Sequence, residues 1–131
     1  MEKSKMFLLF SHKLSDEQKK AAYSDFGIDT FIPLPAELQN IWSNIDPDKE
    51  TLYNVLVPLK TYLNKKAFKN DVVLIQGDFG AVCIMVQYCK EKGFKAVYAT
   101  TRRNVVEYRD DNGRNVKKSI FEFRRFREYG K

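Results

Sequence analysis

The sequence is poor in the residues that build metal centres and disulfides: its 131 residues include one histidine and two cysteines. Cys83 and Cys89 fall in one predicted helix, at a spacing that suits neither a local disulfide nor a pair of metal ligands. We expect both to be small core residues in a reducing compartment, which indicates a cytoplasmic protein. The shortage of metal ligands predicts no metal and no cofactor.

Long hydrophobic runs are also absent. No apolar stretch approaches the ~20 residues that a membrane-spanning helix needs, so we expect no membrane partner. The lysines before the apolar residues 6–11 are reminiscent of a signal peptide, but that stretch is too short and no small-residue cleavage site follows it. Apolar residues make up 44% of the chain and aromatic residues 14%. This composition suffices for a core, and the length fits one domain over residues 1–131.

The positive charge is concentrated near the C-terminus. Residues 102–131 hold ten Lys or Arg and five Asp or Glu, a net charge of +5. Residues 1–101 hold 13 and 12, a net charge of +1. This skew indicates an anionic partner, with nucleic acid or nucleotide first, or else a solvated basic hairpin that aids solubility.

Strand and helix patterns alternate along the chain. We predict strands at residues 6–11, 29–34, 71–76 and 95–100, and two further strands at 104–109 and 116–126 around a turn at 110–113. We predict helices at residues 16–25, 35–43 and 79–92, and one that Asp48 caps and Pro58 kinks. This order indicates an α/β fold with a mostly parallel sheet and a C-terminal antiparallel hairpin at one edge.

Two local signals support these boundaries. Ser15 and Gln18 form a capping box, in which each side chain can bond the backbone amide of the other residue. Pro33 cannot donate to a neighbouring strand, which suits a strand at the edge of the sheet.

Ligands of open α/β sheets bind beyond the carboxyl ends of the strands, where the strand order reverses. Three segments should meet there: residues 11–13, residues 76–81 and residues 100–103. They carry an unusual share of the polar and special residues of the chain. We therefore predict the ligand site at this place.

The segment after the third strand, QGDFGA, opens a helix. Gly77 and Gly80 lack side chains, so a phosphate can approach the free amides of the first helical turn. The alternative is a tight turn with Asp78 as the N-cap residue of the helix. The residues of this segment predicted to bind the ligand are Gln76, Gly77, Asp78, Phe79, Gly80 and Ala81.

His12 is a candidate for proton transfer, because an imidazole with a reference pKa near ~6.5 can give or take a proton. The alternative is an ordinary surface or capping imidazole. A triad of Ser11, His12 and Asp78 is conceivable, but neighbours on an extended segment point apart.

The segment TTRR predicts an anion contact. The guanidinium groups of Arg102 and Arg103 match phosphate oxygens, and the hydroxyls of Thr100 and Thr101 can add hydrogen bonds. The alternative is a solvated turn. Further along, three arginines alternate with aromatic residues, either as a basic stacking face or with the aromatic rings packed inward. We favour inward packing for Phe121 and Phe123.

Five segments together resemble one family: LLFSHKLSDEQ, LPAELQNIWSNIDP, VLIQGDFGA, VYATTRR and FRRFREY. The chain resembles, over nearly its whole length, the small stand-alone Csx-type CRISPR-associated proteins of type III systems, which are regarded as ring nucleases for cyclic oligoadenylate. That family is similar to CARF proteins, which bind cyclic tetra-adenylate across a two-fold dimer interface. The resemblance implies a Rossmann-like, CARF-like three-layer sandwich, a homodimer and a role in antiviral defence.

On this basis the first hypothesis is a metal-independent ring nuclease. It would cleave cyclic oligoadenylate, above all cyclic tetra-adenylate, to linear di-adenylate with a 2′,3′-cyclic phosphate and so switch off type III CRISPR signalling. The RNA carries its own nucleophile, so the protein needs to align it and stabilise charge. We assign proton transfer to His12, a hydrogen-bonding role to Ser11 and charge stabilisation to Arg102 with Arg103.

Two alternatives stay open. The chain can be a sponge that binds the ring without cutting it, since such a protein needs the same site and no proton-transfer group. It can also be a regulatory subunit whose basic hairpin grips longer RNA, although we expect no long nucleic acid as partner.

Overall fold

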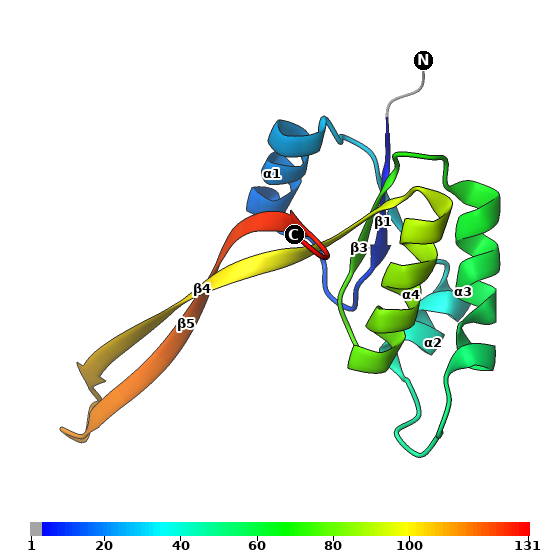
Figure 1. The fold of residues 1–131 in the computed structure, drawn as a ribbon. Helices are drawn as coiled ribbons and strands as arrows, with labels where there is room; N and C mark the ends of the chain where they lie inside the picture. Colours follow the sequence, from blue (N-terminus) through cyan, green and yellow to red (C-terminus); the bar gives the residue numbers. More distant parts are fainter. Residues whose placement is uncertain (1–3) are drawn as a thin grey trace.

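The computed structural model describes residues 4–131, and within this range five strands form one sheet in the order β2-β1-β3-β4-β5 (Figure 1). Residues 1–3, part of the stretch compared above with a signal peptide, lie outside the described range. The strands are β1 (Met6–Leu9), β2 (Phe31–Pro33), β3 (Val72–Ile75), β4 (Lys95–Arg109) and β5 (Asn115–Glu128). The helices are α1 (Asp16–Phe26), α2 (Ala36–Ser43), α3 (Tyr53–Lys66) and α4 (Phe79–Lys92).

The first four strands are parallel and β5 runs antiparallel to β4, which confirms the predicted α/β fold with a C-terminal hairpin. This arrangement is compatible with a Rossmann-like fold. Pro33 lies on the edge strand β2, as its missing amide hydrogen requires. No helix in residues 4–131 has the length and apolar character to cross a membrane.

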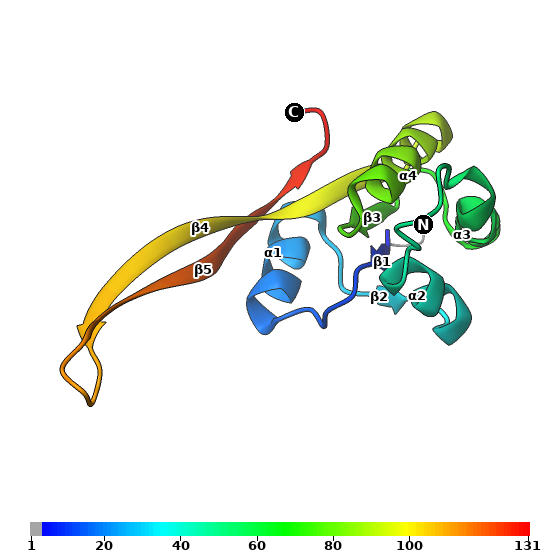
Figure 2. The same ribbon diagram turned by 90° about the horizontal axis from the view of Figure 1, so that it is seen from below.

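Helices cover both faces of the sheet, so the fold has three layers (Figure 2). Alternate residues of the buried strand β3 point to opposite faces, because side chains alternate along a strand. Val73 and Ile75 belong to the larger core, which α2, α3 and α4 cover with buried residues that include Trp42 and Met85. Val72 and Leu74 belong to the smaller core, on the side of α1.

Two capping predictions have different outcomes. The capping box of α1 is confirmed: the Gln18 amide donates to the Ser15 hydroxyl over 3.2 Å, and the Ser15 amide donates to the Gln18 side chain over 2.9 Å. The prediction that Asp48 caps the third helix is wrong, because α3 begins at Tyr53 with no side-chain cap and continues through Pro58. The carboxylate of Asp46 instead accepts from the amide of Asp48 over 2.9 Å, which folds this segment into a turn.

Asp71 ties the amino ends of the central strands together. Its carboxylate is buried, and it accepts from the amide of Lys5 over 3.0 Å and from the amide of Phe68 over 2.8 Å. Both bonds reach residues just before β1 and between α3 and β3. The carboxylate therefore replaces the water that these two amides would otherwise bind.

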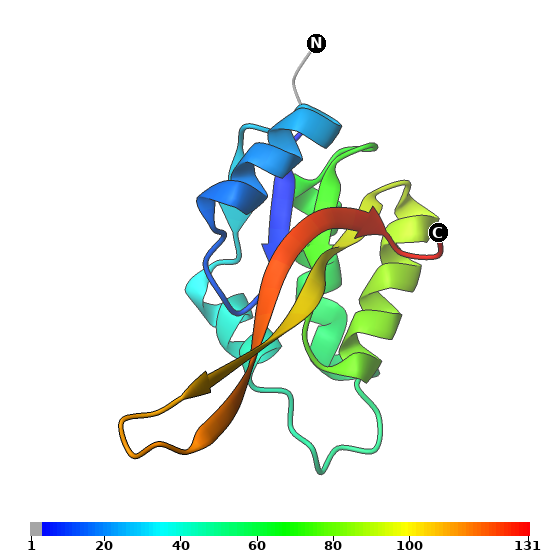
Figure 3. The ribbon, with the colours of Figure 1, turned by 90° about the vertical axis from the view of Figure 1, so that its left-hand side faces the viewer.

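The prediction of separate strands at 95–100 and 104–109 is wrong, because β4 runs unbroken through Thr100, Thr101, Arg102 and Arg103. Here β5 supplies the backbone partners, and a bulge between Thr100 and Thr101 absorbs one extra residue. The Thr100 hydroxyl fastens this bulge: it donates to the carbonyl of Arg125 over 3.0 Å and accepts from its amide over 3.2 Å. Beyond the bulge, residues 101–123 leave the body as a two-stranded arm (Figure 3).

The aromatic residues of β5 are packed inward near the body and exposed on the arm. Phe123 packs against Phe126, with ring centroids 5.1 Å apart, in the core beneath α1, as predicted. Phe121 is 64% exposed, so its predicted inward packing is wrong. The reason is that α1 covers only the base of the arm, and Phe121 lies beyond the buried part of β5. The arginines at 124, 125 and 127 are exposed.

The two cysteines, both free thiols, differ in environment. Cys89 is fully buried in the larger core, and burial raises the pKa of its thiol to about 12. Cys83 is exposed on α4, so the expectation that it is a core residue is wrong. The helix explains the difference, since residues six apart lie on different sides of it.

This difference predicts two distinct reaction rates with a thiol reagent. In the native protein at pH 8, Ellman's reagent should label Cys83 quickly, and Cys89 only after unfolding, since the thiolate is the reactive form. Absorbance of the released thionitrobenzoate measures both phases. Cys83→Ser should remove the fast phase and Cys89→Ser should leave it intact. Two equally fast thiols in the native protein would contradict the burial of Cys89.

Candidate functional site

The candidate site lies at the carboxyl edge of the sheet, where the parallel strands end. β1 and β3 are neighbours, with Leu9 opposite Ile75, and the amide of Gln76 donates to the carbonyl of Leu9 over 3.0 Å. The chain proceeds from β1 to β2 in one direction and from β3 to β4 in the other, so the strand order reverses between β1 and β3. The structure therefore confirms that the segments beginning at Ser11 and Gly77 share one edge.

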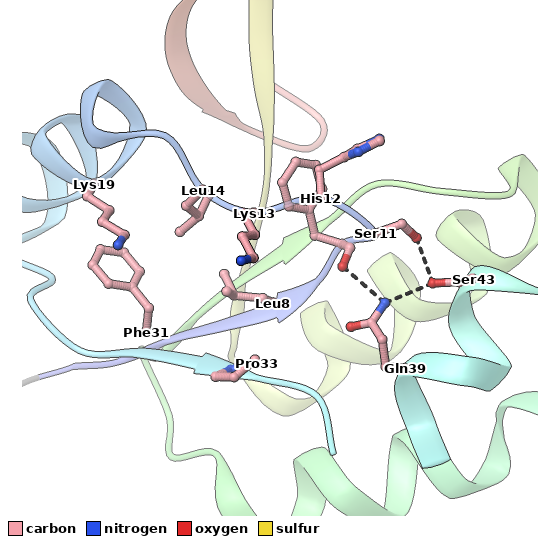
Figure 4. Close-up of a pocket in the computed structure, with 11 residues that line it drawn as sticks. Leu8, Ser11, His12, Lys13, Leu14, Lys19, Phe31, Pro33, Gln39 and Ser43 are labelled. Carbon is pink, nitrogen blue, oxygen red and sulfur yellow. Dashed lines mark hydrogen bonds between the residues drawn. The ribbon is translucent and has the colours of Figure 1, made fainter. Parts of the chain in front are cut away.

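A cavity of about 470 Å³, which we call the β1–β2 pocket, opens at this edge (Figure 4). Its floor is apolar. Figure 4 shows the ends of Lys13 and Lys19 pointing toward Leu8 and Phe31. The residues that line the pocket are Leu8, Phe10, Ser11, His12, Lys13, Leu14, Lys19, Phe31, Pro33, Gln39 and Ser43. Two ammonium groups over an apolar floor suit an anionic ligand with an apolar body.

A hydrogen-bond network fixes one wall of the pocket. The side-chain amide of Gln39 donates to the hydroxyl of Ser43 over 2.9 Å and to the carbonyl of Phe10 over 3.1 Å. The hydroxyls of Ser43 and Ser11 are 2.9 Å apart. Since the Ser43 oxygen accepts from Gln39, its own proton is available to Ser11. This network joins α2 to the segment that follows β1.

His12 is exposed and makes a single ring contact among the described residues, an edge-on contact with Phe10 at 5.4 Å between ring centroids. In Figure 4 its imidazole projects away from Ser11, Gln39 and Ser43. The side chains of Ser11 and His12 thus point apart, as their neighbouring positions predict, and the conceivable triad does not form. Both nitrogens of the imidazole remain available to a ligand at the mouth of the pocket.

Gln76 has a structural task at this edge. Its side-chain oxygen accepts from the amide of Ala99 over 2.8 Å, and its carbonyl accepts from the indole of Trp42 over 3.0 Å. Trp42 also explains Gly77, because a Cβ on residue 77 would lie 3.1 Å from the indole nitrogen. The glycine is therefore required for the packing of Trp42 as well as for any approach of a ligand.

Asp78 is the N-cap residue of α4, which was the alternative to a phosphate site. Its carboxylate accepts from the amide of Ala81 over 3.0 Å, and Ala81 is fully buried. A phosphate contact with the Ala81 amide does not fit this geometry, because the amide is already bonded and the carboxylate repels an anion.

Phe79, by contrast, is 94% exposed at the first turn of α4. Asp78 and Gly80 border a second cavity, of about 510 Å³, beneath residues 45–53. An aromatic ring with almost no contact to its own chain is free to stack on a ligand or a partner. Of the QGDFGA segment, Phe79 is thus the side chain most available for binding.

The arginines of the TTRR segment lie on the arm and do not line the β1–β2 pocket. Arg102 stands opposite Glu122, and Arg103 donates to the hydroxyl of Ser119 over 3.0 Å. The segment was expected in a loop beside Ser11, but its pairing with β5 carries it outward. One chain therefore brings Ser11 and His12 together with the end of β3, and it does not bring Arg102 and Arg103 to them.

Three functional candidates were missed in the sequence: Lys19, Gln39 and Ser43. Gln39 and Ser43 stand four residues apart, which places them on one face of a helix, and this pair of polar residues was a usable signal. Lys19 had no such signal, because its approach to Lys13 depends on how α1 folds back. In the described part of the chain, no three His, Cys, Asp or Glu side chains gather as a metal site would require.

The sequence model of the family described as "Uncharacterized protein MJ1673 family" matches residues 4–127. The chain belongs to the MJ1673 family. Protein MJ1673 of Methanocaldococcus jannaschii, described as uncharacterized, is 48% identical over 126 residues, which cover 95% of this chain and 96% of the relative. No solved structure matches. The similarity to the MJ1673 relative thus includes every segment of the candidate site.

The packing of Trp42 on residue 77 predicts a specific loss of stability. Gly77→Ala should lower the free energy of unfolding by about 1–3 kcal/mol, because the buried indole has little room to move. Gly80→Ala is the matched control: its nearest neighbour is 3.4 Å away, and alanine favours the helix by up to about 1 kcal/mol. Urea unfolding followed by Trp42 fluorescence measures both. Equal stability of the two variants would contradict the proposed packing.

Proposed function

We propose that this chain binds cyclic oligoadenylate at the carboxyl edge of its sheet and cleaves it without a metal ion, as a CARF-like ring nuclease of a type III CRISPR system in the cytoplasm. The observation that carries the proposal is the β1–β2 pocket, where Lys13 and Lys19 stand over an apolar floor next to the reversal of strand order. The resemblance of the sequence to Csx-type proteins supports the choice of ligand.

The pocket suits one adenylate unit of the ring. An adenine can lie on the apolar floor formed by Phe31 and Leu8, and a phosphate can reach the ammonium groups of Lys13 and Lys19. The hydroxyl of Ser11, anchored by Ser43, adds a neutral hydrogen bond. The remaining nucleotides of the ring would stay at the open edge, where the exposed ring of Phe79 offers a stacking surface for an adenine.

The reaction needs only groups that RNA and this chain supply. The 2′-oxygen attacks the neighbouring phosphorus, a P–O2′ bond forms, and the P–O5′ bond breaks. Neutral His12 takes the proton of the 2′-hydroxyl, and the departing 5′-oxygen gains a proton from water or from the imidazolium. Two such cuts turn cyclic tetra-adenylate into two linear di-adenylates, each with a 2′,3′-cyclic phosphate and a 5′-hydroxyl. Lys13 stabilises the charge that develops on the phosphate oxygens.

One observation favours a second candidate, a sponge that binds the ring without cutting it. A catalytic base is ordinarily oriented by a third group, and none of the described residues hydrogen-bonds to His12. Binding through Lys13 and Lys19 needs no such orientation. The two candidates therefore share the binding residues and differ in the role of His12.

Two adjacent lysines of α1 provide a test of the pocket as the binding site. Lys19→Ala should weaken binding of cyclic tetra-adenylate by about tenfold, because a charge-assisted contact is lost. Lys20→Ala removes the same charge from a position that does not line the pocket, and it should leave the affinity unchanged. Calorimetric titration measures both. Equal losses would show that the ring responds only to the overall charge of α1.

His12 distinguishes the nuclease from the sponge. His12→Ala should lower the single-turnover rate of cleavage by about 10²–10⁴-fold and leave the affinity for the ring intact. The wild-type protein should cut labelled cyclic tetra-adenylate in the presence of EDTA, since the nucleophile belongs to the RNA. Chromatography of the products measures both rates. Tight binding without any cleavage by the wild-type protein would replace the nuclease by the sponge, and an unchanged rate for His12→Ala would remove His12 from the mechanism.

A further inference from the structure

Lysine side chains from separate segments of the chain gather at the amino edge of the sheet, opposite the candidate site. One precedes β1, three end α3 or follow it closely, and two lie in the last turn of α4. Figure 1 shows the ends of α3 and α4 beside the beginnings of β1 and β3. The net charge of +1 over residues 1–101 thus conceals a basic surface. We call this group the lysine surface: Lys5, Lys65, Lys66, Lys69, Lys90 and Lys92.

Contacts between these segments hold the lysine surface together. The amide of Asn70 donates to the carbonyl of Gly93 over 3.0 Å, which joins the segment after α3 to the segment after α4. The stem of Lys69 lies against the same glycine, since a Cβ on residue 93 would be 3.1 Å from Cγ of Lys69. The buried carboxylate of Asp71 joins the segment after α3 to the beginning of β1. The lysines are therefore neighbours in one folded surface.

Acidic side chains do not neutralise the lysine surface. Asp71 is only 3% exposed, and its carboxylate accepts from the amides of Lys5 and Phe68. Glu91 is exposed and accepts from the side-chain amide of Gln87 over 3.3 Å. Within residues 4–131, no carboxylate lies within 4.0 Å of any of the six ammonium groups. Their charge is therefore available to an anionic partner.

Stabilisation of helix ends explains only part of this group. The C-terminus of a helix carries a negative partial charge, and lysines in the last turn interact favourably with it. The four lysines of α3 and α4 meet this description. Lys5 and Lys69 lie outside the helices, so the helix ends do not account for them.

An exposed aromatic ring lies among the lysines. Phe68 is 62% exposed, and the ammonium group of Lys5 lies 5.4 Å from the centre of its ring. A base can stack on such a ring while the phosphates on either side of the base reach ammonium groups. An anionic membrane fits this arrangement less well, because insertion of the ring among acyl chains would carry the charge of Lys5 into an apolar medium. The combination of ring and cations therefore favours nucleic acid.

We propose that the lysine surface binds single-stranded nucleic acid, with Phe68 stacked on a base and the ammonium groups at the phosphates. Lysines contact phosphates as point charges, and a phenyl ring stacks on any base, so we expect little preference for sequence. The proposal departs from the expectation that long nucleic acid is not a partner. It concerns the edge opposite the β1–β2 pocket and does not depend on the ligand of that pocket.

Two double variants with the same loss of charge test the lysine surface. Lys66→Ala/Lys92→Ala removes two ammonium groups from it, and Lys20→Ala/Lys49→Ala removes two exposed ones elsewhere, from α1 and from the segment before α3. Fluorescence anisotropy over a range of salt concentrations measures binding of a labelled oligouridylate of about 15 nucleotides to the full chain. Circular dichroism checks the fold of each variant.

The wild-type protein should bind the oligouridylate, and its affinity should fall as salt rises. Lys66→Ala/Lys92→Ala should weaken binding about tenfold, and it should lower the slope of log K against log salt by about 1.4, because each phosphate contact to a single strand contributes about 0.7. Lys20→Ala/Lys49→Ala should keep both the affinity and the slope, since salt screens distant charges. Lys19→Ala, in the β1–β2 pocket, should also bind the oligouridylate like the wild-type protein.

Phe68→Leu tests the stacking contact separately. It keeps an apolar side chain and removes the ring, so it should weaken binding about tenfold and leave the salt slope unchanged. An unchanged affinity of Phe68→Leu, equal losses in the two double variants, or a wild-type protein that does not bind at low salt would overturn the proposal. Binding to vesicles that contain phosphatidylserine, without binding to the oligouridylate, would also overturn it and would assign the surface to an anionic membrane. If Lys66→Ala/Lys92→Ala does not fold, Lys65→Ala/Lys90→Ala takes its place.

Discussion

The carboxyl edge of the sheet depends on Gln76, whose hydrogen bonds join three elements at the point where the parallel ladder stops. Its amide donates a hydrogen bond to β1. Its carbonyl accepts one from the indole of Trp42 in α2, and its side-chain oxygen accepts one from the amide of Ala99 in β4. Where a parallel strand ends, the backbone groups of its neighbours lose their partners, and each needs a replacement. One glutamine supplies them here. It therefore holds β4 to the end of β3 as far as Ala99, just before the bulge at which the arm begins, and it holds α2 beside the neighbouring pocket.

Most of the body followed from local patterns in the sequence. Three such patterns each act over a few residues and can be recognised without a structure. They are the apolar run of β3, the capping box of Ser15 and Gln18, and the glycine that ends α4. The extent of β4 could not be predicted from the sequence. Residues 101–103 have the composition of a polar turn, and only their pairing with β5, about twenty residues further along the chain, makes them part of a strand. The sequence was compatible with two roles for Asp78, contact with a ligand and capping of a helix. Only the hydrogen bond from the Ala81 amide shows that Asp78 caps the helix.

The candidate site shows the same division between local and distant effects. His12 and Ser11 were found because they follow a buried strand, and the position of that strand next to β3 was predictable from its composition. The opposite wall of the pocket was not predictable, since Gln39 and Ser43 reach the pocket through the packing of α2 against Gly77 and Gln76. Lys13 and Lys19 line the same pocket because α1 folds back after the segment that follows β1. The arm separates the arginines from this cluster, so the two positive regions of the chain face different surroundings.

The placement of β3 in the middle of the sheet also has a consequence for biosynthesis. β1 pairs with β2 on one side and with β3 on the other, yet 66 positions separate Lys5 from Asp71, whose carboxylate closes the amino end of this pair. On the ribosome, the apolar residues of β1 therefore emerge long before their central partner exists. The first β-α-β unit must wait with one face of its strands uncovered until α3 and β3 have been synthesised. Chaperones that hold extended apolar segments would meet this nascent chain during that interval. The smaller core would close last, because Phe126, which is buried in it, follows the arm in the chain.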